Sequence, residues 1–497
     1  MTSGGKTAAV IGAGIGGLAL AIRLQSAGID TVVLEARDQP GGRAQVWQRG
    51  GFTFDAGPSS ISDPAALRAL WALSGRDMAE DVTLLPVRPF YRLNWPDGNQ
   101  FDFSDDEQVL QQEILRLDPR DLQGYQRFLD YAAKAKDGAY DRLAQERLTD
   151  FAAMARAVPM LVKTQAWRSA YGIAARFVEN EKLRQALSFQ TLFLGGNPMR
   201  ASGLHALIHM VEKRTGLWFA KGGTGQLVAG MVRLFERLGG TLRLGDPVAE
   251  IETAGDRAIA VRTVAGERLT PTMIASNADI MHSYAHLLAN SPRGRQAADA
   301  LSRKAFSPGM FIVHFGVRGS WPGIPHNMVL FGPRYRGLWG DIFDFGVLPH
   351  DLTLYLHHPT VTDPALAPEG QSVFTAMVPV PNIGRLPVDW NEIGPLIERR
   401  VLDEIGRRLI PDIDARIVTK FHYTPADSAA DLGAYLGNAF SLEPLLKQSG
   451  WFRVHNRDDA IHNLYFVGAG THPGAGIPGV VAGAGITAAM MLEDFRK

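Results

Sequence analysis

Residues 8–22 are AAVIGAGIGGLALAI and residues 31–35 are TVVLE, and these two stretches decide the fold. The first four residues are a short apolar run of the kind found in buried strands. Gly12, Gly14 and Gly17 follow with the spacing G-x-G-x-x-G, and apolar residues then recur at helical spacing. The second stretch is a β-branched strand that ends on an acid. The order strand, glycine turn, helix, strand, acid predicts a dinucleotide-binding βαβ unit.

Each position in this unit has its own physical task. Gly12 permits the tight turn, Gly14 lets backbone approach a pyrophosphate, and Gly17 lets the helix touch the strand. Glu35 lies where a carboxylate accepts both ribose hydroxyls, and its charge disfavours the 2′-phosphate of NADP. The alternative, a glycine-rich turn in an ordinary parallel sheet, does not account for the whole pattern.

Composition excludes several classes of protein. The chain has 497 residues, 46% of them apolar and 21% charged, which is a globular balance with mass for two or three domains. Lys+Arg and Asp+Glu are both 51, so a nucleic acid is not the expected partner. There are no cysteines, which excludes disulfides, thiol nucleophiles and cysteinyl cofactor links.

Apolar stretches are too short to predict a membrane span. The longest, Ala8–Leu20 and Val480–Leu492, contain glycines and fall below the roughly 20 residues that a spanning helix needs. The first residues also lack the pattern of a cleaved signal peptide.

A second motif distinguishes FAD from NAD. Pro40-Gly41-Gly42-Arg43 follows the second strand, and such a turn can lay a guanidinium along a pyrophosphate; a surface turn is the alternative. In this register the sequence resembles the flavoprotein group that includes amine oxidases, carotenoid desaturases and Rab GDP-dissociation inhibitors. The resemblance implies that the dinucleotide is FAD, that Arg43 contacts it, and that residues 54–58, including Gly57, approach the flavin side.

Two later stretches complete the expected cofactor site. Residues 247–276 alternate as a β-meander, and the resemblance implies that backbone near Val248 faces the adenine. Residues 463–467 form a strand, and a glycine-rich loop at 468–479 leads into a helix whose N-terminus would favour an anionic reduced flavin ring. The expected cofactor residues in this last stretch are Gly470, Gly479 and Val480.

Longer strings narrow the family. The loop from Gly468 to Gly479 resembles that of the bacterial-type phytoene desaturases, and the resemblance extends from about residue 7 to the C-terminus. The other strings that carry it include KGGTGQL at 221–227, FGPRY at 331–335, TDPALAPEG at 362–370 and WFR at 451–453. It implies an FAD-dependent desaturase that introduces double bonds into phytoene toward neurosporene or lycopene.

Two stretches depart from related flavoenzymes. Residues 469–471 lack the acid that many of them use to hold the ribityl chain, which leaves that contact to backbone or to Thr471. Residues 151–156 also lack acids, so the sequence gives that region no catalytic role.

The expected fold class is α/β. It combines a Rossmann-like FAD-binding domain of the glutathione-reductase and amine-oxidase type with an α+β substrate domain and a helical, membrane-associating part. The expected boundaries are 1–75, 221–285 and 455–497 for the FAD-binding domain, 76–220 for the substrate and membrane-associating region, and 286–454 for the substrate domain.

The implied substrate bears on where the protein works. A forty-carbon polyene stays in the membrane unless a protein tunnel takes it up, at about 0.8 kcal/mol per buried CH₂. Residues 151–177 are rich in apolar residues with scattered Arg and Lys, and they suit either a core helix or an interfacial helix. We expect a cytoplasmic protein peripherally bound to the cell membrane, with oxygen or a quinone as the electron acceptor.

No catalytic residue and no metal site is assigned from the sequence. The protein must align the substrate carbon, exclude water and stabilise positive charge. Buried polar groups that could do so are more often structural, because they usually satisfy hydrogen bonds. The candidates for charge stabilisation are Asp363, Glu369, His357, Trp167 and Phe189.

Two other functions remain open on the sequence. One is another flavin oxidoreductase of the same fold, such as a desaturase of hydroxylated carotenoids or an amine oxidase. The other is a non-enzymic isoprenoid-binding protein like a GDP-dissociation inhibitor, which the intact glycine turn, Glu35 and Arg43 disfavour.

Overall fold

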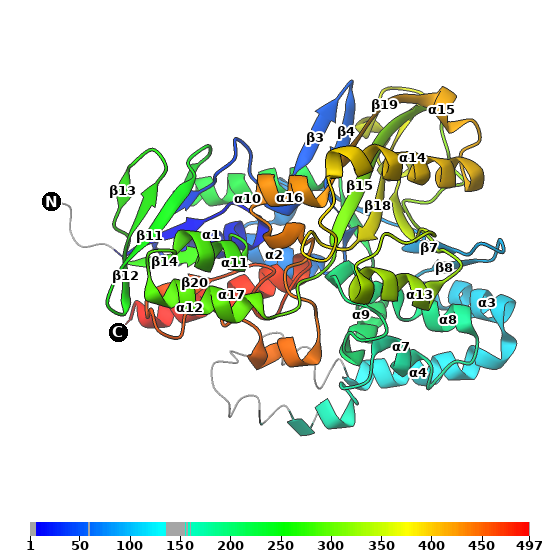
Figure 1. The fold of residues 1–497 in the computed structure, drawn as a ribbon, viewed down its shortest axis with the longest axis horizontal. Helices are drawn as coiled ribbons and strands as arrows, with labels where there is room; N and C mark the ends of the chain where they lie inside the picture. Colours follow the sequence, from blue (N-terminus) through cyan, green and yellow to red (C-terminus); the bar gives the residue numbers. More distant parts are fainter. Residues whose placement is uncertain (1–5, 58–59, 136–154, 156–157, 160, 497) are drawn as a thin grey trace.

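The computed structural model describes residues 6–57, 60–135, 155, 158–159 and 161–496. Two parts lie side by side: a parallel sheet with its helices, and a larger sheet with a group of helices beneath it (Figure 1). This α/β architecture is the fold class that the sequence predicts. The five-segment domain division stays a prediction.

The parallel sheet is assembled from three separated stretches of the chain. Its order is β10-β2-β1-β14-β20, and every neighbouring pair is parallel. The first βαβ unit therefore lies beside the strand that follows the meander and the strand near the C-terminus, as the sequence predicts. The bounds are β1 (Thr7–Ile11), β2 (Asp30–Leu34), β10 (Thr241–Arg243), β14 (Met273–Ser276) and β20 (Leu464–Phe466).

Three helices cover one face of this sheet. α1 (Ile15–Ser26) is apolar almost all round because it is enclosed by the sheet, α10 (Thr224–Arg237) and α17 (Ile477–Asp494). Among the described residues, α17 alone is long and apolar enough to cross a membrane by length and composition. It packs against α1 within this cluster, which is the environment of a core helix.

The predicted meander covers the other face. β11 (Val248–Ala254), β12 (Arg257–Thr263) and β13 (Arg268–Leu269) form an antiparallel sheet, as expected from their alternation. Ile251 and Val261 pack there with Ile11 and Ile274 of the parallel sheet.

The larger sheet has seven strands in the order β19-β15-β18-β17-β16-β7-β8. Alternate residues of β15 point to opposite faces. Phe311, Val313 and Phe315 pack toward α14 (Trp390–Arg408), whereas Ile312 belongs to a second cluster on the opposite face. The bounds are β19 (Ile417–Tyr423), β15 (Gly309–Arg318), β18 (Gln371–Val380), β17 (Leu354–His357), β16 (Asn327–Leu330), β7 (Tyr91–Asn94) and β8 (Gln100–Phe103).

The second cluster joins the sheet to the helices. Phe189 and Leu207, from the helical region, pack in it with Tyr355 and Met377 of the sheet. A hairpin of β3 (Val46–Arg49) and β4 (Phe52–Asp55) rises from the parallel part and also contributes to this cluster. The helices include α3 (Glu107–Leu117), α4 (Leu122–Ala135), α7 (Ala170–Ala174), α8 (Glu181–Ala186) and α9 (Ile208–Thr215).

The region expected to be one helix at 151–177 is interrupted where the structure describes it. Residues 164–167 form turns, Gln165 has a φ of 50°, and the Ser169 side chain caps the start of α7. Most of 151–156 lies outside the described residues, so the expectation for that stretch is not addressed.

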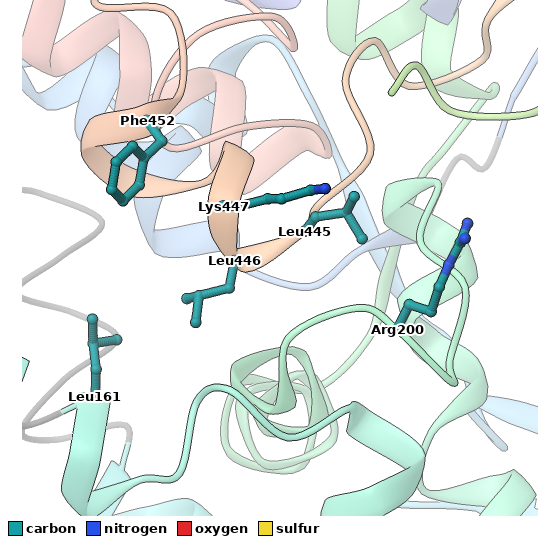
Figure 2. A pocket seen from close by; sticks show the side chains of 6 residues that line it. All are labelled: Leu161, Arg200, Leu445, Leu446, Lys447 and Phe452. Atoms are coloured by element: carbon teal, nitrogen blue, oxygen red, sulfur yellow. The ribbon is translucent and has the colours of Figure 1, made fainter. Parts of the chain in front are cut away.

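A hollow of about 580 Å³ opens next to this region (Figure 2). Leu161, Leu446 and Phe452 line it with Leu445, and Arg200 and Lys447 bring positive charge to it. It therefore has an apolar lining beside two cations.

Candidate functional site: a dinucleotide cradle beside a buried sheet face

The N-terminal glycine turn has the geometry that its sequence predicts. Gly12 has a φ of 97°, which L-residues rarely adopt. A Cβ at Gly17 would lie 2.1 Å from the carbonyl oxygen of Gly12, so the helix reaches the strand only because residue 17 has no side chain. α1 begins after Gly14 with no side-chain cap and no acid in its first turn. Its N-terminus therefore favours an anion.

Glu35 lies at the end of β2 beside this turn. Its Oε2 accepts a hydrogen bond from Ala13 N at 2.7 Å, and its Oε1 accepts one from Arg37 N at 3.1 Å. The Glu35 carbonyl accepts a bond from Asp246 N, which brings the segment leading to Val248 alongside. The residues predicted to contact the ribose and the adenine therefore lie next to each other.

Asn277 belongs to this turn, although the sequence analysis does not assign it a role. It follows β14, and its side-chain atoms would lie 2.8 Å from a Cβ at Gly14, 2.7 Å from one at Gly16 and 2.7 Å from one at Gly468. One amide thus requires glycine in both the N-terminal turn and the C-terminal loop. The signal that could have found it is topological, because the carboxyl ends of parallel strands meet at one edge.

The second glycine turn rests on the first. Gly41 N donates to the carbonyl of Ala13, and Gly41 and Gly14 form an isolated parallel bridge. A Cβ at Gly57 would lie 3.3 Å from the carbonyl oxygen of Arg43. Residues 12–14, 41–43 and 57 therefore form one continuous backbone surface.

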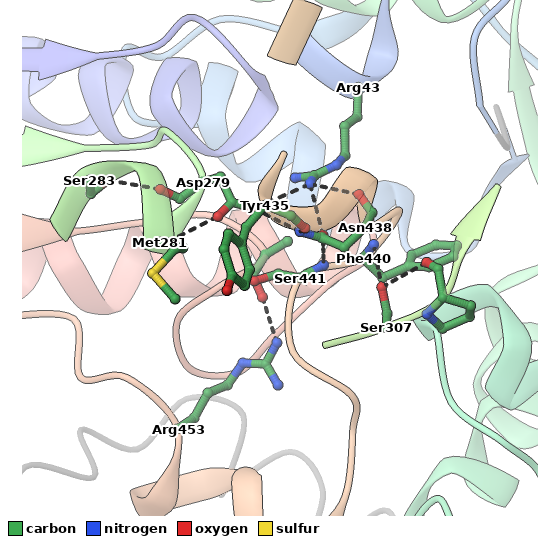
Figure 3. Close-up of polar contacts among 12 residues, drawn as sticks. Arg43, Asp279, Met281, Ser283, Ser307, Tyr435, Asn438, Phe440, Ser441 and Arg453 are labelled. Carbon is green, nitrogen blue, oxygen red and sulfur yellow. Dashed lines mark hydrogen bonds and ion pairs between the residues drawn. The ribbon is translucent and has the colours of Figure 1, made fainter. Parts of the chain in front are cut away.

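Arg43 extends from this surface toward the segment 435–441 (Figure 3). Its NH2 group donates to the Asn438 carbonyl at 3.3 Å and to Asn438 Oδ1 at 3.1 Å, and it lies 3.6 Å from Asp279 Oδ2. The buried Nε of Arg43 has no partner. Sequence analysis missed Asp279 and Asn438, which hold the guanidinium; its contact with the pyrophosphate stays a prediction.

The C-terminal loop, residues 468–479, lies on the other side of the segment 435–441 from Arg43 (Figure 3). A Cβ at Gly470 would lie 2.8 Å from Ile280 Cβ and 3.2 Å from Ser441 Oγ, and one at Gly479 would lie 2.7 Å from the Gly474 carbonyl oxygen. Val480 N donates to Gly476 O in the first turn of α17, which has no side-chain cap. The three predicted loop residues thus lie at close contacts that leave no space for a side chain or at an open helix N-terminus.

Ser441 is a further residue that sequence reasoning missed. It has a φ of 66°, is 1% exposed, and its Oγ has no hydrogen-bond partner. An unpartnered buried hydroxyl is costly unless a ligand or water satisfies it. Its position beside Gly470 directs that hydroxyl toward the loop.

These features fit FAD. Glu35 would bind the ribose, the N-terminus of α1 and Arg43 the pyrophosphate, and the 468–480 loop the region of the flavin. The unpartnered Arg43 Nε and Ser441 Oγ supply two donors that such a polar ligand can satisfy.

Two carboxylates hold the turn that precedes α10. Asp55 Oδ1 accepts from Thr224 N at 2.9 Å, and Asp363 Oδ2 accepts from Gly222 N at 2.6 Å. Asp363, a candidate for charge stabilisation, therefore has a structural hydrogen bond. Three other candidates for charge stabilisation do not belong to this turn. Glu369 and Trp167 are exposed, whereas Phe189 is buried among aromatic rings.

A polar row crosses the buried face of the seven-stranded sheet. His314, Thr375, His357 and Asn327 are consecutive cross-strand partners on β15, β18, β17 and β16. His314 Nδ1 lies 3.0 Å from Thr375 Oγ1, and His357 Nε2 lies 3.9 Å from Asp55 Oδ2. Burial lowers the pKa of His314 to about 3, so this imidazole is neutral at physiological pH.

A buried acid lies in the same cluster. Glu212 accepts a hydrogen bond from Tyr91 Oη at 2.9 Å and another from Gln190 Nε2. Burial raises the pKa of Glu212 to about 8, against the lowering effect of these two bonds. The cluster is therefore dry enough to keep a carboxyl group protonated near neutral pH.

Comparisons with known proteins agree with this geometry. Residues 15–492 match the family described as flavin containing amine oxidoreductase. The chain is 52% identical to the lycopene-forming phytoene desaturase of Paracoccus sp. over 99% of this chain and 98% of that protein. It is 38% identical to the neurosporene-forming phytoene desaturase of Rhodobacter capsulatus over 100% of this chain and 95% of that protein.

Solved structures show the same fold. Putrescine oxidase with bound putrescine aligns with a TM-score of 0.64 at 16% identity, over 99% of each chain. Together, the full-length identity, the family match and the cradle establish an FAD-dependent oxidoreductase. The chain belongs to the flavin containing amine oxidoreductase family and, within it, to the bacterial-type phytoene desaturases.

Proposed function

We propose that the protein desaturates phytoene and carries the reaction to lycopene. The observation that carries this proposal is full-length identity of 52% to a lycopene-forming desaturase, against 38% to a neurosporene-forming one. The dry cluster next to the FAD cradle supports it, because an apolar polyene needs an apolar site.

The chain's own residues would hold the polyene and exclude water. When bound, FAD supplies two-electron oxidation of a saturated carbon–carbon unit. The rings of Trp47 and Phe421 lie 5.7 Å apart on the hairpin and on β19, and Tyr423 adjoins Trp47, so aromatic side chains gather at this end of the cluster. The guanidinium of Arg49 lies 3.9 Å from the centre of the Phe421 ring, so that ring already holds a cation.

Phytoene in liposomes tests the activity directly. FAD-loaded protein is incubated with these liposomes, and absorption spectra of the extracted pigment are recorded over time. We expect the long-wavelength bands of lycopene to accumulate. Accumulation that stops at neurosporene would contradict the end product, and no coloured polyene at all would contradict the activity.

We further propose that the protein docks on the cytoplasmic side of the cell membrane through the region around the hollow. Trp167, Val162 and Phe452 are 57%, 54% and 43% exposed there or in the adjoining chain segment. Lys447 lines the same hollow, and exposed Lys163 adjoins Val162, so cations accompany the apolar side chains as at an anionic lipid surface.

Vesicle sedimentation tests this docking. We expect the double variant Trp167→Ser, Phe452→Ser to bind anionic phosphatidylglycerol vesicles at least several-fold more weakly. Val264→Ser is the control, because Val264 is also exposed but lies in the meander, directly after β12. Equal binding by wild type, double variant and control would contradict the proposed surface.

We propose oxygen or a quinone as the electron acceptor. A quinone dissolved in the same membrane would reach a docked enzyme directly. Anaerobic assays with and without added quinone distinguish the two acceptors, and turnover in the absence of both would contradict the proposal.

A further inference from the structure

Arg453 lies beneath the C-terminal loop and holds it by two hydrogen bonds. Its Nε donates to the Thr471 carbonyl at 2.9 Å, and its NH2 group donates to the Ala469 carbonyl at 2.6 Å. A Cβ at Gly474 would lie 3.5 Å from the guanidinium carbon, so the side chain follows the loop. Arg453 is 4% exposed.

No carboxylate among the described residues forms an ion pair with Arg453. Burial lowers the pKa of this guanidinium to about 10, so it is still charged at neutral pH. Carbonyl dipoles alone balance a buried charge poorly. An anion near the loop would complete the compensation.

Neighbouring groups also experience this positive charge. Lys304 donates to the carbonyl of Phe452, next to Arg453 in the chain. Burial lowers the pKa of Lys304, and the charge of Arg453 lowers it further. The same two causes act on His205, whose pKa falls to about 4 despite a hydrogen bond to the backbone of Pro444. The charge of Arg453 therefore acts on both of these neighbours.

Two more features place favourable sites for an anion at the C-terminal loop. The N-terminus of α17 is open and follows the loop directly. Ser441 Oγ is buried, unpartnered and next to Gly470. Figure 3 shows Arg43 and Arg453 approaching the segment that carries Asn438 and Ser441 from opposite sides.

We propose that Arg453 is the fixed positive charge that balances bound FAD, acting as a positioning residue through the loop that it holds. The inference rests on the cofactor site and is independent of which substrate is oxidised. It gives a role to Arg453 of the WFR string at 451–453, which the proposed activity leaves unexplained.

The charge acts on both binding and reduction. FAD carries a negatively charged pyrophosphate, and uptake of two electrons with one proton makes the cofactor one unit more negative. At an effective dielectric constant of about 20, one positive charge at a separation of about 10 Å would favour that change roughly tenfold. Loss of the charge therefore makes the reduction potential more negative and weakens FAD binding.

Arg453→Gln and Arg453→Lys separate charge from hydrogen bonding. Purified apoprotein is titrated with FAD, and the reduction potential of the reconstituted protein is measured against reference dyes without phytoene. We expect Arg453→Gln to bind FAD about tenfold more weakly and to have a more negative potential. Arg453→Lys keeps the charge, so its potential stays near that of wild type.

Lys304→Glu provides a second test if Arg453→Gln does not fold. It places a carboxylate beside Arg453 from a half-buried position, and we expect the potential to become more negative. Arg408→Gln is the control, because Arg408 of α14 also donates to backbone carbonyls, those of Phe331 and Asn94, but is paired with Glu404.

The reduction potential of the bound FAD is the measurement that tests the inference. A wild-type potential in both Arg453→Gln and Lys304→Glu would overturn it, as would an equal shift in Arg408→Gln. These measurements use no phytoene, so they are distinguishable from a failure of the desaturase assay.

Discussion

Gly17 is the residue at which the cradle tolerates least change. A Cβ there would lie 2.1 Å from the Gly12 carbonyl oxygen, which is backbone and cannot move independently, and 3.1 Å from Asn277 Cβ. We expect Gly17→Ala to cost about 1–3 kcal/mol or more by overpacking and to lower the flavin content of the purified protein. Gly323→Ala is the control because a Cβ there meets nothing within 4 Å. Equal flavin content in the two variants would contradict this account.

Glu35 is the residue predicted to bind the ribose through its charge. Removing its carboxylate leaves the amide of Ala13 without its acceptor and removes the expected hydroxyl contacts. Charge-assisted hydrogen bonds contribute about 1.5–3 kcal/mol each, so Glu35→Ala should weaken FAD binding by roughly 10- to 100-fold. Titration of apoprotein with FAD measures this. The exposed Glu236→Ala serves as the control, and unchanged affinity in both would show that the nucleotide lies elsewhere.

At the residue scale, sequence predicts what local chemistry requires. Gly12 and Gly17 are predictable because the turn needs a positive φ and a close approach within a few residues. Asn277, Asn438 and Ser441 are not, because their roles arise only when distant stretches meet. The partner of Arg43 illustrates this, since Asn438 lies 395 positions away in the chain.

The turn before α10 is an element whose stability depends on a distant acid. Asp363 Oδ2 accepts from Gly222 N at 2.6 Å, and an unsatisfied amide there costs about 1–3 kcal/mol. We expect Asp363→Ala to release flavin at a temperature several degrees lower on heating, followed by flavin fluorescence. Asp363→Asn keeps an acceptor and should remain near wild type, as should exposed Asp256→Ala. Identical release by Ala and Asn variants would contradict the assigned bond.

Elements formed by local contacts are the ones that sequence predicts. The unit β1-α1-β2, the meander and the strand–loop–helix at the C-terminus each have a clear period and short turns. The seven-stranded sheet is different, because β16 pairs with β7 across more than two hundred residues and no local pattern specifies that pairing. Likewise, apolar composition at 151–177 does not reveal the turn at Gln165.

At the scale of the whole molecule, the cluster between the seven-stranded sheet and the helices makes the free energy of unfolding depend on pH, because it contains a buried acid. Glu212 has a pKa of about 8 when folded, against 4.5 for an exposed glutamate, because burial disfavours its charge. Folding therefore binds a proton: the contribution is complete below about pH 4.5 and is lost as the pH rises through about 8. The loss is on the order of a few kcal/mol.

Glu212→Gln removes this dependence while keeping the shape of the side chain. The amide can still accept from Tyr91 Oη, and it carries no charge to desolvate at high pH. We expect the unfolding temperature of wild type to fall between pH 6 and 9 more steeply than that of Glu212→Gln. Glu236→Gln, which changes an exposed glutamate, should follow wild type. Parallel curves for wild type and Glu212→Gln would mean that this acid is ionised in the folded protein, and the sheet face would then be wetter than its packing indicates.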